Sequence, residues 1–190
     1  VQVDLRGTGA STGCLDWNGP GEQQDVVTAV EWAAAQPWSN GRVGLFGKSY
    51  DGVTGLIAAG NQPRGLAAVV AQEPAMEPYT YLYNNEVPYY NAIGTSLSYD
   101  EIAASPGRVL HDTPEYMKNS VYEVAHPHCL SDNLRNSLDP IRSHKYWRDR
   151  SFLTKTHNSP VPLFISAGLI EDNTAVSYTH LRAHETLRYL

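Results

Sequence analysis

The segment around Ser49 constrains the fold of this chain more than any other part of the sequence. A short apolar stretch, Arg42–Phe46, runs into the turn Gly47-Lys48-Ser49-Tyr50-Asp51-Gly52. A stretch of small residues, Val53–Ala59, follows and is expected to end at Gly60 and Pro63. The apolar stretch predicts a strand and the small residues predict a helix. Glycines on both sides of the turn allow the strand and the helix to approach closely. The segment therefore predicts a sharp strand–turn–helix connection that presents the Ser49 hydroxyl above a sheet.

The flanking segments predict the rest of a parallel sheet. Val1–Leu5 alternates apolar and polar residues, as a strand does, and Glu22–Gln36 has the pattern of a helix. Leu66–Ala71 is an unbroken apolar run, typical of a strand buried on both faces. The apolar face of the predicted helix consists of Val26, Val30 and Ala33 or Ala34. This alternation of strands and helices predicts an α/β fold with helices on both faces of the sheet.

Residues 74–158 interrupt this pattern. They are rich in tyrosine, proline and asparagine, and we expect a mostly helical cap insertion with helices within Asp112–Val124 and Leu130–Trp147. Val161–Ser166 then predicts a further strand, followed by the polar loop Glu171-Asp172-Asn173. Carboxylates just beyond the carboxyl end of a strand lie where open parallel sheets place their chemistry. The predicted core therefore comprises residues 1–73 and 159–175.

Composition excludes several classes of function. The chain has 190 residues, of which 42% are hydrophobic and 18% charged, which is enough for a folded domain with a core. No apolar run reaches the ~18 residues of a membrane span, so no membrane partner is expected. The net charge is −6 without a basic stripe, so nucleic acid is not an expected partner. The compartment stays open: the cytoplasm is slightly favoured, and secretion is not excluded because we expect the native N-terminus to be absent from this sequence.

The cysteines and most histidines receive no functional role from the sequence. Cys14 and Cys129 are too few for a disulfide framework and form no metal-ligand pair with each other. His126 and His128 form an H-x-H pair, which would bind zinc if both rings shared one face of a strand. No third set of ligands is evident near them, so solvated cap histidines are the preferred interpretation. We therefore expect no metal.

The turn itself has three interpretations. Its spacing, G-x-S-x-x-G, is one residue longer than the commonest nucleophile turn, and a glycine-rich turn without chemistry is one alternative. The letters Gly47-Lys48-Ser49 also match the end of a phosphate-binding loop. That loop requires an earlier glycine where this chain has Arg42, and Val43–Phe46 is too apolar for a flexible loop. A serine nucleophile is the preferred interpretation.

Several stretches resemble the X-prolyl dipeptidyl-peptidase and cocaine-esterase group of serine hydrolases. Val3–Ser11 has the pattern D-x-R-G-x-G-x-S, Glu31–Gly44 resembles the next stretch of that group, and Gly47–Gly52 resembles its nucleophile turn. Gly65–Tyr83 looks like the entry into the cap, and Val161–Asp172 is similar to the strand that delivers the acid. The resemblance covers about residues 1–175 and does not separate the members of the group.

The resemblance implies an α/β-hydrolase fold with a helical cap and a Ser–Asp–His triad. Ser49 matches the nucleophile, and Asp172, rather than its neighbour Glu171, matches the acid. The backbone N–H of Tyr50 matches one oxyanion donor, while the second donor is a tyrosine side chain upstream of the D-x-R-G-x-G stretch. No metal or organic cofactor is implied.

The last residues, 176–190, are unlike the family. They are similar to the conceptual translation of a transposase-type sequencing-library adaptor, so we expect them not to be native. The fold places its histidine after the acid, where the chain offers only His180 and His184. Both lie in the adaptor-like segment and too close to Asp172 for an intervening helix and strand. We therefore expect a fragment of a larger enzyme, inactive by itself.

Substrate choice is expected to lie with the cap. An X-Pro dipeptidyl-peptidase must bind a free α-amino group, and Glu73 is the first candidate carboxylate, with Glu77 and Asp51 behind it. Tyr79 and Tyr83 are candidate pocket residues, although packing within the cap is the competing interpretation. Tyr81, Tyr89 and Tyr90 belong to the same tyrosine-rich stretch.

The predicted partner is a small peptide or an acyl-ester substrate. An ester or amide acyl hydrolase of the cocaine-esterase type is the alternative activity. A non-catalytic, truncated or degenerate hydrolase domain is the alternative of another class. Oligomeric state and a further β-sandwich domain are left open by the sequence.

Overall fold

The computed structural model describes residues 1–75, 77–89 and 128–167, with short stretches between residues 94 and 126. The chain divides into two compact units. The first comprises Val1–Asp25 and Leu82–Arg150, and the second comprises Val26–Tyr81 and Ser151–Leu190. The domain boundaries expected from the sequence, at residues 73, 158 and 175, stay predictions.

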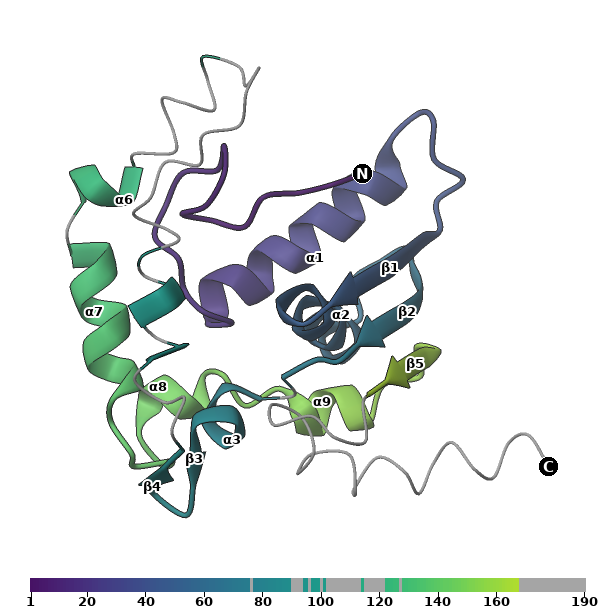
Figure 1. Cartoon of the computed structure of the whole chain (residues 1–190). Helices are drawn as coiled ribbons and strands as arrows, with labels where there is room; N and C mark the ends of the chain where they lie inside the picture. The colour runs from purple at the N-terminus through teal and green to yellow at the C-terminus, as the bar shows by residue number, and fades with distance from the viewer. Residues whose placement is uncertain are drawn as a thin grey trace. The chain divides into compact units, whose positions relative to one another are not determined.

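The second unit is built on a three-stranded parallel sheet. Its strands are β1 (Val43–Lys48), β2 (Leu66–Gln72) and β5 (Leu163–Ser166), in the order β1-β2-β5 (Figure 1). Leu45 of β1 pairs with Val69 of β2. A parallel sheet connected through helices is the α/β architecture that the sequence predicts.

One face of this sheet is packed against helix α2 (Tyr50–Asn61). Leu56 and Ile57 of α2 are completely buried together with Val69 of β2 and Phe152. A second helix, α9 (Leu153–His157), packs on α2. The burial of these apolar side chains is the main source of stability for this unit.

The other face of the sheet carries a row of apolar side chains. Phe46, Val70 and Phe164 lie side by side in the strand register. Phe46 is 72% exposed and Phe164 is 56% exposed. In β2, Val69 and Ala71 are buried while the remaining residues are partly exposed. Among the described residues, β2 is therefore buried on the face that packs against α2, and not on both faces as expected.

Helix α1 (Pro20–Ala35) begins two residues before its predicted start. Proline suits the first turn of a helix because its missing N–H has no intrahelical partner there. The predicted apolar face is confirmed, since Val26, Val30 and Ala33 are all buried.

Two local predictions are wrong. Val1–Leu5 forms no strand, because a strand requires a hydrogen-bonded neighbour and none of β1, β2 and β5 pairs with it. Helix α2 continues through Gly60, where an added Cβ would lie 3.0 Å from the Thr156 hydroxyl of α9. This glycine permits close packing of two helices and does not end one.

Helical structure is present within residues 130–147, as expected, but no single helix runs through the whole stretch. The structure has two helices there, α7 (His128–Ser137) and α8 (Lys145–Arg148). Pro140 separates them, since proline disfavours a helical conformation at the residue before it and cannot donate a helical hydrogen bond. Asp139 turns the chain by accepting a hydrogen bond from the Ile141 N–H at 3.0 Å.

The described residues of the first unit form several short elements besides the N-terminal loop. They are α6 (Tyr122–Ala125), α7, α8 and the antiparallel pair β3 (Tyr83–Asn84) and β4 (Val87–Pro88). A further short helix, α3 (Pro78–Leu82), lies where the two units meet in the sequence. These helices lie within the predicted mostly helical insertion.

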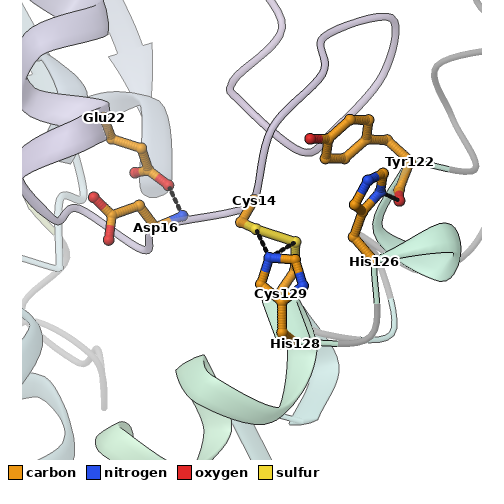
Figure 2. Close-up of a disulfide and its surroundings, with 7 residues drawn as sticks. All are labelled: Cys14, Asp16, Glu22, Tyr122, His126, His128 and Cys129. Carbon is orange, nitrogen blue, oxygen red and sulfur yellow. Dashed lines mark hydrogen bonds between the residues drawn. A yellow bond between two sulfur atoms is a disulfide. The ribbon is translucent and has the colours of Figure 1, made fainter.

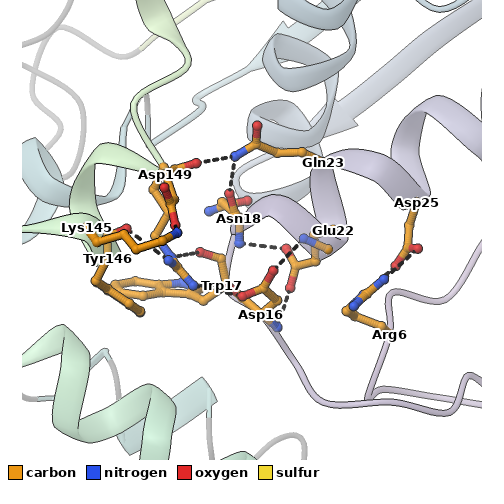
Figure 3. Close-up of polar contacts among 12 residues, drawn as sticks. Arg6, Asp16, Trp17, Asn18, Glu22, Gln23, Asp25, Lys145, Tyr146 and Asp149 are labelled. Carbon is orange, nitrogen blue, oxygen red and sulfur yellow. Dashed lines mark hydrogen bonds and ion pairs between the residues drawn. The ribbon is translucent and has the colours of Figure 1, made fainter.

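A polar network organises the N-terminal loop of the first unit, and Figure 3 shows Asp16, Trp17 and Glu22 among its members. The buried Arg150 guanidinium donates to the carbonyl oxygens of Trp17 at 3.1 Å and Asp16 at 2.6 Å. It also pairs with an Asp16 carboxylate oxygen at 2.9 Å. The buried Glu22 carboxylate accepts the N–H groups of Asp16 and Asn18, at 2.9 Å and 2.7 Å. Together these bonds fix the loop that leads into α1.

None of the described helices has the length and apolar character needed to cross a membrane.

Candidate active site

Ser49 occupies a strained turn between a strand and a helix. It is the single residue between the end of β1 at Lys48 and the start of α2 at Tyr50. Its backbone has φ 55° and ψ −117°. This conformation is rare for residues with a side chain, and such strain persists only where the surroundings enforce it. Here the Ser49 N–H donates to the Gln72 carbonyl at 2.9 Å, and its carbonyl accepts the Val53 N–H at 3.0 Å.

Both glycines of the turn are required by close backbone contacts. A Cβ on Gly47 would lie 2.5 Å from the backbone carbonyl of Asp51. A Cβ on Gly52 would lie 3.0 Å from the Gln72 carbonyl oxygen and 3.3 Å from that of Gly47. The longer spacing of this turn therefore places its second glycine on the inner face of α2, where helix and strands approach most closely.

The side chain of Ser49 is exposed and does not cap α2. Serine at the start of a helix commonly uses its hydroxyl as a cap, and the Ser49 hydroxyl makes no such bond. The backbone amide of Tyr50 is the first of α2. The amino end of a helix carries a partial positive charge, which favours a developing negative charge nearby.

The carboxyl ends of all three strands lie at this edge. Glu73 follows β2 directly, has a φ of 44°, and donates its N–H to the Ser166 carbonyl of β5 at 2.7 Å. Its carboxylate pairs with Lys48, the last residue of β1, at 3.0 Å. Ser49 and Glu73 therefore follow neighbouring strands, which is where open parallel sheets bind ligands.

Other predicted site residues are placed less favourably for contact with a substrate. Tyr83 is buried, donates its hydroxyl to the Ser137 carbonyl at 2.9 Å, and packs edge-on against Trp147. Tyr79 is 4% exposed in α3. Buried surroundings of this kind are typical of tyrosines that pack within a fold, which is the competing interpretation of the tyrosine-rich stretch. Their role toward a substrate is not tested by this geometry.

The remaining acidic candidates differ in exposure. Glu77 is 3% exposed, whereas Asp51 is exposed in the first turn of α2. Tyr90, Glu171 and Asp172 lie outside the described residues, as do His111, His180 and His184. The triad itself therefore stays a prediction.

The structure joins two cysteines for which the sequence predicts no role. Cys14 and Cys129 form a disulfide across a sequence separation of 115 residues (Figure 2). His128 lies beside it, with Nε2 3.7 Å from the Cys14 sulfur and 4.0 Å from the Cys129 sulfur. The sequence shows no third ligand set near the H-x-H pair; the structure brings Cys14 and Cys129 to His128, whereas His126 does not belong to this cluster. Nothing in the local pattern around Cys14 could have revealed this, because only the fold brings the two segments together.

The H-x-H pair also does not lie on a strand. His126 follows α6, stacks on the Tyr122 ring, and its Nδ1 lies 2.7 Å from the Tyr122 carbonyl oxygen. His128 begins α7. The two imidazole rings are 6.0 Å apart and nearly perpendicular. The pair therefore does not form the shared face on which a zinc site between the two histidines would depend.

The geometry around Ser49 agrees with a comparison of sequences. The profile of the X-Pro dipeptidyl-peptidase (S15) family matches residues 1–189. The chain belongs to the S15 family. The predicted resemblance is thereby confirmed, and the match continues past residue 175 into the segment that was expected to be unlike the family.

Curated relatives of this S15 chain include two kinds of protein. A Streptomyces avermitilis protein named "Putative Xaa-Pro dipeptidyl-peptidase" is 30% identical over 107 residues, covering 48% of this chain and 16% of the relative. A Mycobacterium bovis protein named "Putative serine esterase" is 35% identical over 82 residues, covering 42% of this chain and 13% of the relative. The matched region is therefore a small part of either relative.

Solved structures agree on the fold. A CocE/NonD family hydrolase from Staphylococcus aureus aligns with a TM-score of 0.55 at 23% identity, over 80% of this chain and 24% of that one. An aminopeptidase from a marine sediment archaeon, Thaumarchaeota archaeon, aligns with a TM-score of 0.57 at 20% identity, over 85% of this chain and 30% of that one. With the parallel sheet described above, these alignments show that this S15 chain has an α/β-hydrolase core.

Proposed function

We propose that Ser49 is the nucleophile of a serine hydrolase and that this chain supplies the nucleophile-bearing part of its active site. The observation that carries the proposal is the strained backbone of Ser49, at φ 55° and ψ −117°, between β1 and α2. A turn of this kind projects the serine hydroxyl away from both elements. Strain of roughly 1–3 kcal/mol persists at such positions when function requires the geometry.

The proposed mechanism is acyl transfer through Ser49. Its Oγ attacks the acyl carbon of the substrate, while a histidine that we expect outside residues 1–175 accepts the proton and later donates it to the leaving group. Asp172 orients that histidine. The Tyr50 N–H stabilises the oxyanion at the positive end of α2. Water then releases the acyl group from Ser49.

The proposed substrate class is a peptide with an N-terminal Xaa-Pro pair. Such a substrate carries a free ammonium group, and the Glu73 carboxylate lies at the same sheet edge as Ser49. Lys48 already pairs with Glu73, so a bound ammonium group would share this carboxylate with it. The name of the Streptomyces avermitilis relative supports this substrate. The name of the Mycobacterium bovis relative supports the alternative, an acyl ester.

The test compares the 190-residue chain with the full-length protein of its source gene. Both are assayed with a Xaa-Pro p-nitroanilide and with a p-nitrophenyl acyl ester. We expect the full-length protein to turn over the anilide and to lose more than about 10³-fold in kcat/KM with Ser49→Ala. The 190-residue chain should show no turnover that depends on Ser49. Unchanged activity of full-length Ser49→Ala would overturn the nucleophile assignment.

Glu73→Gln separates the two substrate classes. If Glu73 binds the ammonium group, this variant should raise KM for the free dipeptide anilide. The same variant should leave KM nearly unchanged for an N-blocked anilide and for the ester, which serve as internal controls. An equal change in KM for all three substrates would show that Glu73 does not recognise the ammonium group. Preferential turnover of the ester would favour the esterase alternative.

A further inference from the structure

Three potential metal ligands meet in the first unit, away from Ser49 in sequence. The sulfur atoms of Cys14 and Cys129 and a ring nitrogen of His128 lie within 4.8 Å of one another. Cys129 is buried, Cys14 is half-buried and His128 is exposed. Figure 2 shows the His128 ring directed at both sulfurs, with Nε2 at 3.7 Å and 4.0 Å from them.

This donor set has the chemistry of a zinc site. Thiolate sulfur and imidazole nitrogen are the ligands that Zn²⁺ prefers, with Zn–S distances of about 2.3 Å and Zn–N distances of about 2.0–2.1 Å in a tetrahedron. Those bond lengths place a sulfur and a nitrogen ligand about 3.5 Å apart, and two sulfur ligands about 3.8 Å apart. The imidazole therefore lies close to its ligand position already, and only the two sulfurs must separate.

We propose that Cys14, Cys129 and His128 bind Zn²⁺ when the disulfide is reduced. A dithiol reductant supplies the two electrons: its own sulfurs become a disulfide, and the Cys14–Cys129 bond becomes two thiols. Zinc then binds as both thiols release their protons to solvent, and no further electron moves. The two thiolate charges neutralise the ion. Disulfide and zinc are mutually exclusive occupants of the same pair of sulfurs.

The proposed site lies at the wall of a cavity. All three ligands line a cavity of about 590 Å³ in the first unit. Among the described residues, no other histidine, cysteine or carboxylate joins the cluster. A zinc ion held by three protein ligands keeps an open position for water or another small ligand. The proposed site is therefore accessible to solvent from the cavity.

Either occupant would hold the same two segments together. Cys14 lies in the loop that precedes α1, and Cys129 lies in the first turn of α7. The disulfide ties these segments in an oxidising compartment. Zinc would tie them where cellular thiols reduce the bond, so the loop keeps its attachment under both conditions.

The test uses the full 190-residue chain and Co²⁺ as a spectroscopic substitute for Zn²⁺. After reduction by a dithiol and removal of the reductant under anaerobic conditions, we expect one Co²⁺ per chain. Its spectrum should show thiolate-to-metal charge transfer and the visible bands of a tetrahedral ion, and Zn²⁺ should displace it. The oxidised chain should show neither feature. Other histidines of the chain, His180 and His184 included, give no thiolate band, so the readout is specific.

Variants make the test decisive. Cys14→Ser should abolish the two-thiolate spectrum. His128→Ala leaves the disulfide intact for folding. Removing an outer-shell partner of a metal site lowers the metal affinity by about 10–100-fold, so removing the proposed ligand His128 should lower the Co²⁺ affinity of the reduced chain by more than that. His157→Ala, an exposed histidine of α9, is the matched control and should leave the affinity unchanged. A reduced chain without the charge-transfer band, or a His128→Ala variant that binds like the wild type, would overturn the proposal.

Discussion

Replacing Ser49 with glycine should stabilise this chain relative to replacing it with alanine. Ser49 has φ 55° and ψ −117°, which is close to the first central position of a type II′ turn. Glycine adopts this conformation without a steric penalty, whereas alanine keeps the clash of the Cβ. Both substitutions remove the hydroxyl, so the loss of its interactions cancels in the comparison.

The expected size follows from two opposing terms. Relief of the backbone strain favours glycine by roughly 1–3 kcal/mol. The greater freedom of glycine in the unfolded chain disfavours it by about 0.4–1 kcal/mol. Ser49→Gly should therefore exceed Ser49→Ala in free energy of unfolding by about 1 kcal/mol. For a chain of this length, that difference corresponds to about 2–4 °C in Tm.

The assay is urea unfolding of four variants, followed by circular dichroism. The second pair is Ser151→Gly and Ser151→Ala, at an exposed position that is not among the residues with positive φ. There glycine should be the less stable by about 0.4–1 kcal/mol. The difference between the two glycine–alanine comparisons isolates the strain, because the unfolded-state term is common to both.

One result would refute this reasoning. If the glycine–alanine difference at Ser49 equals that at Ser151 within about 0.5 kcal/mol, the turn at Ser49 is unstrained in solution. The structural argument for an enforced nucleophile turn would then fail, whatever the activity of the full-length protein.

Three further outcomes are expected. Gly47→Ala should destabilise the chain by about 1–3 kcal/mol in denaturant titrations, because its Cβ would lie 2.5 Å from the Asp51 backbone. Gly44→Ala is the matched control, since no atom lies within 4 Å of the added Cβ, and it should cost less than about 1 kcal/mol. Arg150→Met should lower the free energy of unfolding by about 3 kcal/mol, because it leaves the Asp16 carboxylate and the Trp17 carbonyl without their buried donor. Arg148→Met, at an exposed position, is the control and should change the free energy of unfolding by less than about 0.5 kcal/mol. The hydrogen bond with His144, followed by that from the Ile141 N–H, lowers the pKa of Asp139 from its ordinary value of 3.8, so the wild type should exceed Asp139→Asn in stability above that pH. This advantage should disappear as the pH falls through the folded-state pKa, and unfolding midpoints that run parallel across the acid range would contradict it.

Local sequence patterns were sufficient for the elements that depend on near neighbours. The apolar spacing of Val26 and Val30 predicted the buried face of α1, since a helix places every third or fourth residue on one side. The turn Gly47–Gly52 predicted a sharp connection, since both of its glycines are required by contacts a few residues away or on the adjacent strand. The ends of helices were predicted less well. Gly60 lies inside α2 because its neighbour is Thr156, which is distant in the sequence.

The sequence by itself therefore determined the α/β class, the position of the sharp strand–turn–helix connection at Ser49 and the membership of a hydrolase group. These properties follow from periodicity and from motifs that are contiguous in the chain. Only the tertiary structure decided that Glu73 pairs with Lys48, that Tyr83 packs within the first unit, and that Cys14 meets Cys129. Each of these contacts joins segments whose separation in the chain carries no local signal. They form because burying the intervening apolar residues brings the segments together.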